Sequence, residues 1–237
     1  GYSDKVEIIE NNETTIIETN DPFVELKKLL GKSNDQKYRY LGGAVGVVNY
    51  DSIRLVENIS KENNLSQPIM EFGIYDDGLL YDNVEKKLFY FYHDVNRFHE
   101  LIVSDDSFDE FNSSEVTPNM DKEKFSSIVN KAKQYIHDGD IFQVVLSRKF
   151  AFDTSGDNLT LYKTLRKLNP SPYMYHLKQD SKTIIGASPE MLVRITDDKV
   201  ETFPIAGTRK ITDNEEKNKA LSEELIHDEK ELAEHTM

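Results

Sequence analysis

Cysteine is absent from this 237-residue sequence. Its absence excludes disulfides, thiolate catalysis and cysteine-ligated zinc, and it is typical of a reducing compartment, so we expect a cytoplasmic location. The sequence also lacks an apolar run long enough to cross a bilayer. Neither a secretory signal nor an initiator methionine stands at its start, which leads us to expect that the chain begins inside a longer protein.

Basic clusters are also missing. The sequence has 29 Lys and Arg against 43 Asp and Glu, and its formal net charge is −14. This balance argues against nucleic acid and anionic membrane as partners, because both need clustered positive charge. An anionic substrate would need a local cationic site or a metal ion. The length allows one large domain or two small ones.

Alternating apolar and polar residues predict several strands. Hairpins are predicted where two such runs flank a short polar turn, at residues 6–18, 173–187 and 191–203. The runs 69–75, 78–82 and 87–93 predict a three-stranded antiparallel meander. Residues 41–50 and 141–152 are more continuously apolar, which is typical of buried strands.

Helices are predicted where apolar residues recur at helical spacing behind a capping residue. They begin after Asp21, Asp121, Asn158 and Asp213. Gly31 and Gly139 are expected to end the first two, residue 168 ends the third, and the fourth runs to the end of the chain. Residues 104–118 are acidic and rich in Ser and Asn, so we expect a mobile linker between an N-terminal portion, 1–103, and a second region, 119–237.

The stretch 184–209 contains two corners of small residues, at 186–188 and 206–208, where backbone can approach a ligand closely. The predicted hairpin between them would bring Glu190 beside the corner Ala206-Gly207-Thr208. A carboxylate beside backbone amides and a hydroxyl is compatible with an ordinary strand-end turn. It is also the arrangement of a general acid beside an anion-binding corner.

Two further features have both a structural and a functional interpretation. Gln143 stands in the strand predicted at 141–152, where it would be either a hydrogen-bonded core amide or a site residue. On a continuous C-terminal helix, His227, Glu231 and Glu234 form one stripe. That stripe is either a solvated acidic face or a set of ligands for a hard cation.

Five motifs in order resemble the chorismate-utilising enzymes, and most closely the large subunits (component I) of anthranilate synthases. They are GDIFQVVLSR (139–148), NPSPYM (169–174), GASPE (186–190), PIAGTR (204–209) and DEKELAEHTM (228–237). The resemblance covers nearly the whole chain. It implies an α+β fold in which two antiparallel sheets pack together with helices outside, incomplete in this chain.

The resemblance also implies a reaction. Chorismate and ammonia would be converted to anthranilate and pyruvate in tryptophan biosynthesis, with ammonia taken from glutamine by a partner amidotransferase. Glu190 would protonate the departing C4 hydroxyl, with Gln143 and Thr208 as further catalytic residues, and Ala206, Gly207 and Thr208 would line the substrate.

Magnesium is the cofactor that the resemblance implies. Glu234 would ligate Mg²⁺, with Glu231 just outside the direct ligands. The family's second metal glutamate and its glycine-rich carboxylate-binding segment have no counterpart up to Met237, and its upstream Leu-Leu-Glu-Ser segment is also missing. The chain therefore corresponds to roughly the first half to two-thirds of the enzyme, and we expect it to be inactive alone.

Particular positions distinguish the branches of the family. Water-adding relatives, the isochorismate and salicylate synthases, have lysine where this chain has Gln143, and aminodeoxychorismate synthases have lysine where it has Ala206. Within NPSPYM, Pro172, Tyr173 and Met174 match contacts to the feedback inhibitor tryptophan. The alternatives are an aminodeoxychorismate or isochorismate synthase relative, or a non-catalytic fragment with a partial binding surface.

Overall fold

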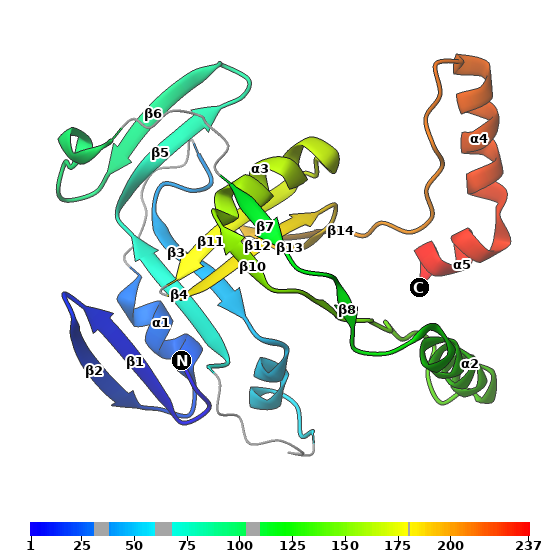
Figure 1. The fold of residues 1–237 in the computed structure, drawn as a ribbon, viewed down its shortest axis with the longest axis horizontal. Coiled ribbons are helices and arrows are strands. Elements are labelled where there is room, and N and C mark those ends of the chain that lie inside the picture. The colour runs from blue at the N-terminus through cyan, green and yellow to red at the C-terminus, as the bar shows by residue number, and fades with distance from the viewer. Residues whose placement is uncertain (31–37, 60–67, 103–109, 180) are drawn as a thin grey trace. The chain divides into compact units, whose positions relative to one another are not determined.

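The computed structural model describes residues 1–30, 38–59, 68–102, 110–179 and 181–237 (Figure 1). The chain divides into two compact units, Gly1–Asp106 and Ser107–Met237, which we call the N-terminal and C-terminal units. Within the described residues the strands pair in antiparallel twos, as seven two-stranded sheets, with helices in both units. The α+β class predicted from the sequence is confirmed. No helix in the described ranges is long and apolar enough to cross a membrane.

In its described residues, the N-terminal unit contains six strands, one α-helix and two 3-10 helices. In chain order they are β1 (Lys5–Glu10), β2 (Glu13–Glu18), α1 (Pro22–Leu29), β3 (Gly43–Val48), a 3-10 helix (Tyr50–Leu55), β4 (Met70–Tyr75), β5 (Asp77–Asp82), β6 (Lys87–Tyr92) and a second 3-10 helix (Phe98–Glu100). Its most buried apolar residues are Val6, Ile69 and Met70, on or next to β1 and β4. Pro22, at the start of α1, is fully buried as well.

Local signals explain the first hairpin and helix, and both predictions are confirmed. Asn11 and Asn12 have φ of 51° and 66°, the left-handed pair that a two-residue turn between β1 and β2 needs. The Asp21 carboxylate accepts from the backbone N–H of Phe23 at 3.0 Å and caps α1. The helix end predicted at Gly31 lies outside the described residues.

The glycine-rich run predicted as a strand at 41–50 forms β3, which pairs with β4. A Cβ atom at Gly46 would lie 2.0 Å from the carbonyl oxygen of Glu71, so only glycine allows this close approach. Most of the strand is half-buried rather than fully buried.

The predicted three-stranded meander is wrong at one connection. β4 pairs with β3, whereas the one described partner of β5 is β6. One residue, Asp76, joins β4 to β5, and a hairpin needs at least two residues in its loop, so the chain passes into a different sheet.

The described part of the C-terminal unit contains eight strands and four α-helices. They are β7 (Phe111–Ser113), β8 (Thr117–Pro118), α2 (Lys122–Asp138), β9 (Phe150–Ala151), β10 (Thr154–Gly156), α3 (Asn158–Leu168), β11 (Tyr173–Gln179), β12 (Lys182–Ser188), β13 (Met191–Thr196), β14 (Lys199–Phe203), α4 (Glu215–His227) and α5 (Glu229–Thr236). The hairpins predicted at 173–187 and 191–203 are confirmed as β11–β12 and β13–β14. Helix α3 packs on β11 and β12, with the rings of Tyr162 and His176 5.9 Å apart.

The helix predicted after Asp121 is also confirmed. The Asp121 carboxylate accepts from the N–H of Lys124 at 2.7 Å, and Gly139 ends α2 with a φ of 81°. The cap of α3 was assigned one residue too late. Asp157, rather than Asn158, accepts from the N–H of Leu159 at 3.0 Å.

The buried strand predicted at 141–152 is wrong. Only Phe150–Ala151 is a strand, β9, and it pairs with β8. Residues 141–149 have no regular structure, and Phe142 and Val145 are 80% and 87% exposed. An apolar run becomes a strand only when another strand completes its hydrogen bonds, and none among the described residues does so here. Of the predicted linker 104–118, residues 104–109 lie outside the description, and the rest contributes β7 and β8.

The single C-terminal helix predicted after Asp213 is two helices. Asn214 caps α4, and the chain turns at Asp228, where ψ is 114°. The Asp228 carboxylate accepts from the N–H of Glu231 at 3.0 Å and starts α5. His227 therefore precedes the break and does not share a helix stripe with Glu231 and Glu234.

An ion pair beside the β5–β6 hairpin generates a pH prediction. Asp77 pairs with Arg97 and also accepts from the Tyr90 hydroxyl at 2.6 Å. Hydrogen bonds from Arg97, and then from Tyr90, hold the pKa of Asp77 below its ordinary value. A lowered carboxylate pKa stabilises the fold above the ordinary pKa, and this contribution is lost as the pH falls through the folded-state pKa.

We therefore expect a carboxyl NMR titration to place the pKa of Asp77 below 3.8, and Arg97→Gln to raise it toward that value. Lys87→Gln is the matched control, because Lys87 lies on the same hairpin but pairs with Glu85. An equal change in both variants would show that the Arg97 contact does not set the titration.

Candidate functional site

The β13–β14 hairpin brings Glu190 to the corner at 206–208. Met191 at the start of β13 pairs with Phe203 at the end of β14, so the chain before one and after the other lies together. The N–H of Ile205 donates to the Glu190 carboxylate at 3.2 Å, and the Ser188 hydroxyl donates to the Glu190 carbonyl at 3.1 Å. The predicted juxtaposition is confirmed, and the Glu190 side chain stays exposed.

Helix α5 supplies a second carboxylate to the same corner. A Cβ atom at Gly207 would lie 2.0 Å from a carboxylate oxygen of Glu231, so glycine makes room for that side chain. The Glu231 side chain is 16% exposed and also pairs with Lys230 at 3.4 Å. Gly207 and Glu231, which the resemblance assigned separately, are therefore direct neighbours.

Arg209 is a residue of this corner that the sequence reasoning missed. Its guanidinium lies 3.1 Å from the Glu224 carboxylate, 3.4 Å from that of Asp228 and 3.9 Å from that of Glu231. It also donates to the carbonyl of Thr208 at 3.1 Å. The available signal was a basic residue directly after the small-residue corner and before an acidic helix.

The predicted metal ligands are only partly assembled. Glu234 is exposed on α5, and no hydrogen bond or ion pair joins its carboxylate to another residue in the described ranges. Across the same residues, no group of three or more His, Asp or Glu side chains is arranged to hold a metal ion. A carboxylate is the oxygen donor that Mg²⁺ prefers, so Glu234 fits one position of a hydrated magnesium ion.

The other predicted site residues have no described side-chain contact with Glu190 or α5. Gln143 is exposed in the irregular segment 141–149, and no described contact joins it to Glu190 or to α5. Pro172 is exposed just before β11, where Tyr173 pairs with Ser188 and Met174 with Ala187. Successive strand residues point to opposite faces, so the side chains of Tyr173 and Met174 cannot both cover one face of the hairpin.

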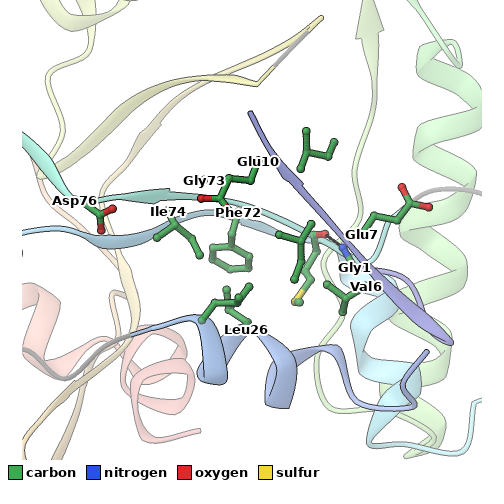
Figure 2. A pocket seen from close by; sticks show the side chains of 13 residues that line it. Gly1, Val6, Glu7, Glu10, Leu26, Phe72, Gly73, Ile74 and Asp76 are labelled. Carbon is green, nitrogen blue, oxygen red and sulfur yellow. Dashed lines mark hydrogen bonds between the residues drawn. The ribbon is translucent and has the colours of Figure 1, made fainter. Parts of the chain in front are cut away.

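A pocket of about 580 Å³ lies within the N-terminal unit, between β1, α1 and β4. Figure 2 shows Phe72 of β4 and Leu26 of α1 pointing toward one another inside it. Glu7, Glu10 and Asp76 add carboxylates to its lining. None of the residues that the sequence predicted for catalysis, metal binding or regulation lines this pocket, so it does not form part of the candidate site.

Comparison with known proteins supports the family resemblance. Residues 2–237 match the family described as chorismate binding enzyme. This chain belongs to that family. It is 38% identical to anthranilate synthase component 1 of Acetivibrio thermocellus, over all of this chain and 54% of the relative. It is 37% identical to the Aquifex aeolicus protein of the same name, over 98% of this chain and 52% of that protein.

A crystal structure of anthranilate synthase component I from Streptococcus pneumoniae is similar in fold as well. It matches with a TM-score of 0.79 and 31% identity, over 98% of this chain and 56% of the other. The chain thus spans about half the length of the relatives it matches.

The contact between Glu190 and Ile205 generates a prediction about local stability. Glu190→Ala removes the acceptor of the Ile205 N–H, a hydrogen bond that contributes about 1 kcal/mol. We expect the Ile205 amide to exchange with deuterium roughly five-fold faster, measured by NMR. Glu190→Gln is the control, because its amide oxygen still accepts. If the Ile205 amide exchanges at the native rate in both variants, the hydrogen bond between Ile205 and Glu190 does not stabilise the corner at 206–208.

Proposed function

We propose that this chain is part of an anthranilate synthase large subunit, which forms anthranilate and pyruvate from chorismate and ammonia in tryptophan biosynthesis. The observation that carries the proposal is the Glu190 carboxylate held beside the 206–208 corner by the N–H of Ile205. Family membership over residues 2–237 and 31–40% identity to relatives named anthranilate synthase support the assignment.

Glu190 is the proposed general acid. Loss of the C4 hydroxyl of chorismate needs a proton, because hydroxide is a poor leaving group. The Ile205 N–H orients the Glu190 carboxyl group, and the side chain remains exposed where a substrate could reach it. Its proton would pass to the C4 oxygen as the C4–O bond breaks.

The 206–208 corner is the proposed wall of the substrate site. Gly207 has no side chain, and the Thr208 side chain is exposed and can donate its hydroxyl proton. Backbone and hydroxyl donors at this corner suit a ligand with carboxylate groups, which an otherwise acidic chain would repel.

Gln143 and Ala206 are the residues from which we infer that ammonia is the nucleophile that attacks C2. Water is a weak nucleophile that must lose a proton to a base as it attacks C2, whereas neutral ammonia attacks without prior deprotonation, so a glutamine suffices at position 143. Ala206 has no amino group with which to attack, which leaves ammonia as the species that bonds to C2. A partner amidotransferase acting on glutamine would supply it, and we propose that both act in the cytoplasm.

Magnesium is the proposed cofactor, with Glu234 as its ligand and Glu231 beside it. When bound, Mg²⁺ would neutralise a substrate carboxylate. This chain's own contribution is to hold Glu231 at Gly207 and leave Glu234 exposed. One carboxylate binds a hydrated hard cation weakly, so we propose that the 237-residue chain alone shows no turnover.

A second candidate is a non-catalytic fragment with a partial binding surface. The state of Gln143 favours it, because this side chain is exposed and no described contact joins it to the Glu190 corner. Activity in the complete enzyme would require the segment 141–149 to be ordered against the site.

Product identity tests the proposed nucleophile. In a protein of the relatives' full length that contains this chain, we expect chorismate, Mg²⁺ and ammonium to give anthranilate, detected by its fluorescence. Glu190→Gln should lower kcat by at least about 100-fold, the usual contribution of a general acid. Lys178→Ala, an exposed change on β11, is the control and should leave turnover unchanged. Isochorismate or aminodeoxychorismate as the main product would refute the assignment.

Feedback inhibition tests the role of residues 172–174, which we propose to bind tryptophan. Met174→Ala removes apolar contact, so we expect the inhibition constant for tryptophan to rise about tenfold, equivalent to about 1.4 kcal/mol. Chorismate turnover without tryptophan should change little.

Because Tyr173 points to the opposite face, comparing Met174→Ala with Tyr173→Ala identifies the face that binds the inhibitor. Identical native inhibition curves for both variants would exclude this segment from the regulatory site.

A further inference from the structure

Arg209 connects three elements of the C-terminal unit through one guanidinium. Its side chain is 24% exposed and contacts Glu224 on α4, Asp228 at the junction and Glu231 on α5. A guanidinium is planar and carries five N–H donors, so it can serve several carboxylates at once, whereas an ammonium acts as a compact point charge.

Among the described elements, helix α5 packs on α4 and has few other contacts to fix its position. It is eight residues long, none of which is buried. A helix of this length is marginal unless tertiary contacts hold it. Without a cation, the three carboxylates around Arg209 would also repel one another.

The corner at 206–208 is the surface on which α5 rests. The Glu231 carboxylate occupies the space that a Cβ atom at Gly207 would fill. Arg209 is two residues further along the same chain and pairs with Glu231 directly. The guanidinium therefore holds α5 to the segment that follows β14, in which Arg209 lies.

We propose that Arg209 is a positioning residue that holds α5 against the 206–208 corner and so places Glu231 at Gly207. Its consequence for catalysis rests on the proposed function, because Glu231 and Glu234 share α5. Since Glu231 already has Arg209 as its counter-charge, a cation that approaches this helix meets the exposed carboxylates of Glu229 and Glu234 instead.

Hydrogen–deuterium exchange of the 237-residue chain, followed by mass spectrometry, tests this placement. We expect Arg209→Gln to speed exchange roughly five-fold or more in peptides that cover 204–209 and 229–237. Arg194→Gln is the matched control, because Arg194 forms a comparable ion pair with Glu201 in the same unit and is 27% exposed. It should leave α5 at the native rate.

Chemical rescue separates the guanidinium from a general effect on stability. In Arg209→Ala, millimolar guanidinium chloride should restore slow exchange in 229–237, whereas the same concentration of sodium chloride should not. Rescue by both salts would mean that screening suffices, and it would overturn the specific role of Arg209. Native exchange of α5 in Arg209→Gln would overturn it as well.

A second variant covers the case in which Arg209→Gln loosens the whole unit. Glu231→Gln then tests the proposal, because it removes the charge of the other partner in the Arg209–Glu231 ion pair. Faster exchange confined to α5 and the corner supports the proposal, and unchanged exchange there overturns it. Chorismate is absent from this experiment, so its outcome is independent of whether the proposed reaction is correct.

Discussion

Antiparallel pairing of β13 with β14 is the constraint on which the candidate site depends. The pairing of Met191 with Phe203 forces the chain before β13 to meet the chain after β14. Glu190 directly precedes Met191, Ile205 is the second residue after Phe203, and a hydrogen bond joins the two. The acid and the small-residue corner are therefore neighbours because of strand register.

Charge imposes the second constraint on this corner. A chain with a net charge of −14 repels anionic ligands at long range, so any anion site needs local donors. At the corner, backbone N–H groups and Thr208 are available as donors. Arg209 forms ion pairs with Glu224, Asp228 and Glu231, so its charge is already balanced by carboxylates of the protein itself. Its role is thus to organise the acidic helices, which leaves Glu234 exposed.

The elements that could be predicted from the sequence are those whose determinants lie within a few residues. Asn11-Asn12 fixes the β1–β2 turn, and Asp121 with Gly139 fixes both ends of α2. The prediction of Glu190 beside the corner succeeded because the short turn between β13 and β14 pairs these strands antiparallel. The register shifts between Met191 and Arg194, but Met191 still pairs with Phe203 at the end of the hairpin.

The failures have the opposite cause. Residues 141–149 have strand-like composition, yet a strand also needs a partner that composition cannot supply. Asp228 fits a charged helix by composition, yet its side chain caps a new helix, so the stripe from His227 to Glu234 does not exist. Arg209 was missed because its three partners come together only when α4 and α5 fold back toward the corner.

The strand register also connects the two functions proposed for this chain. Tyr173 pairs with Ser188, and the Ser188 hydroxyl holds the carbonyl of Glu190 two residues later. A ligand bound at Tyr173 or Met174 would therefore contact the strand pair that delivers the general acid. Coupling between sites requires an element whose position both ligands affect. In the proposed enzyme that element is the β11–β12 hairpin. Its second strand, β12, ends at Ser188, and the loop that carries Glu190 begins there.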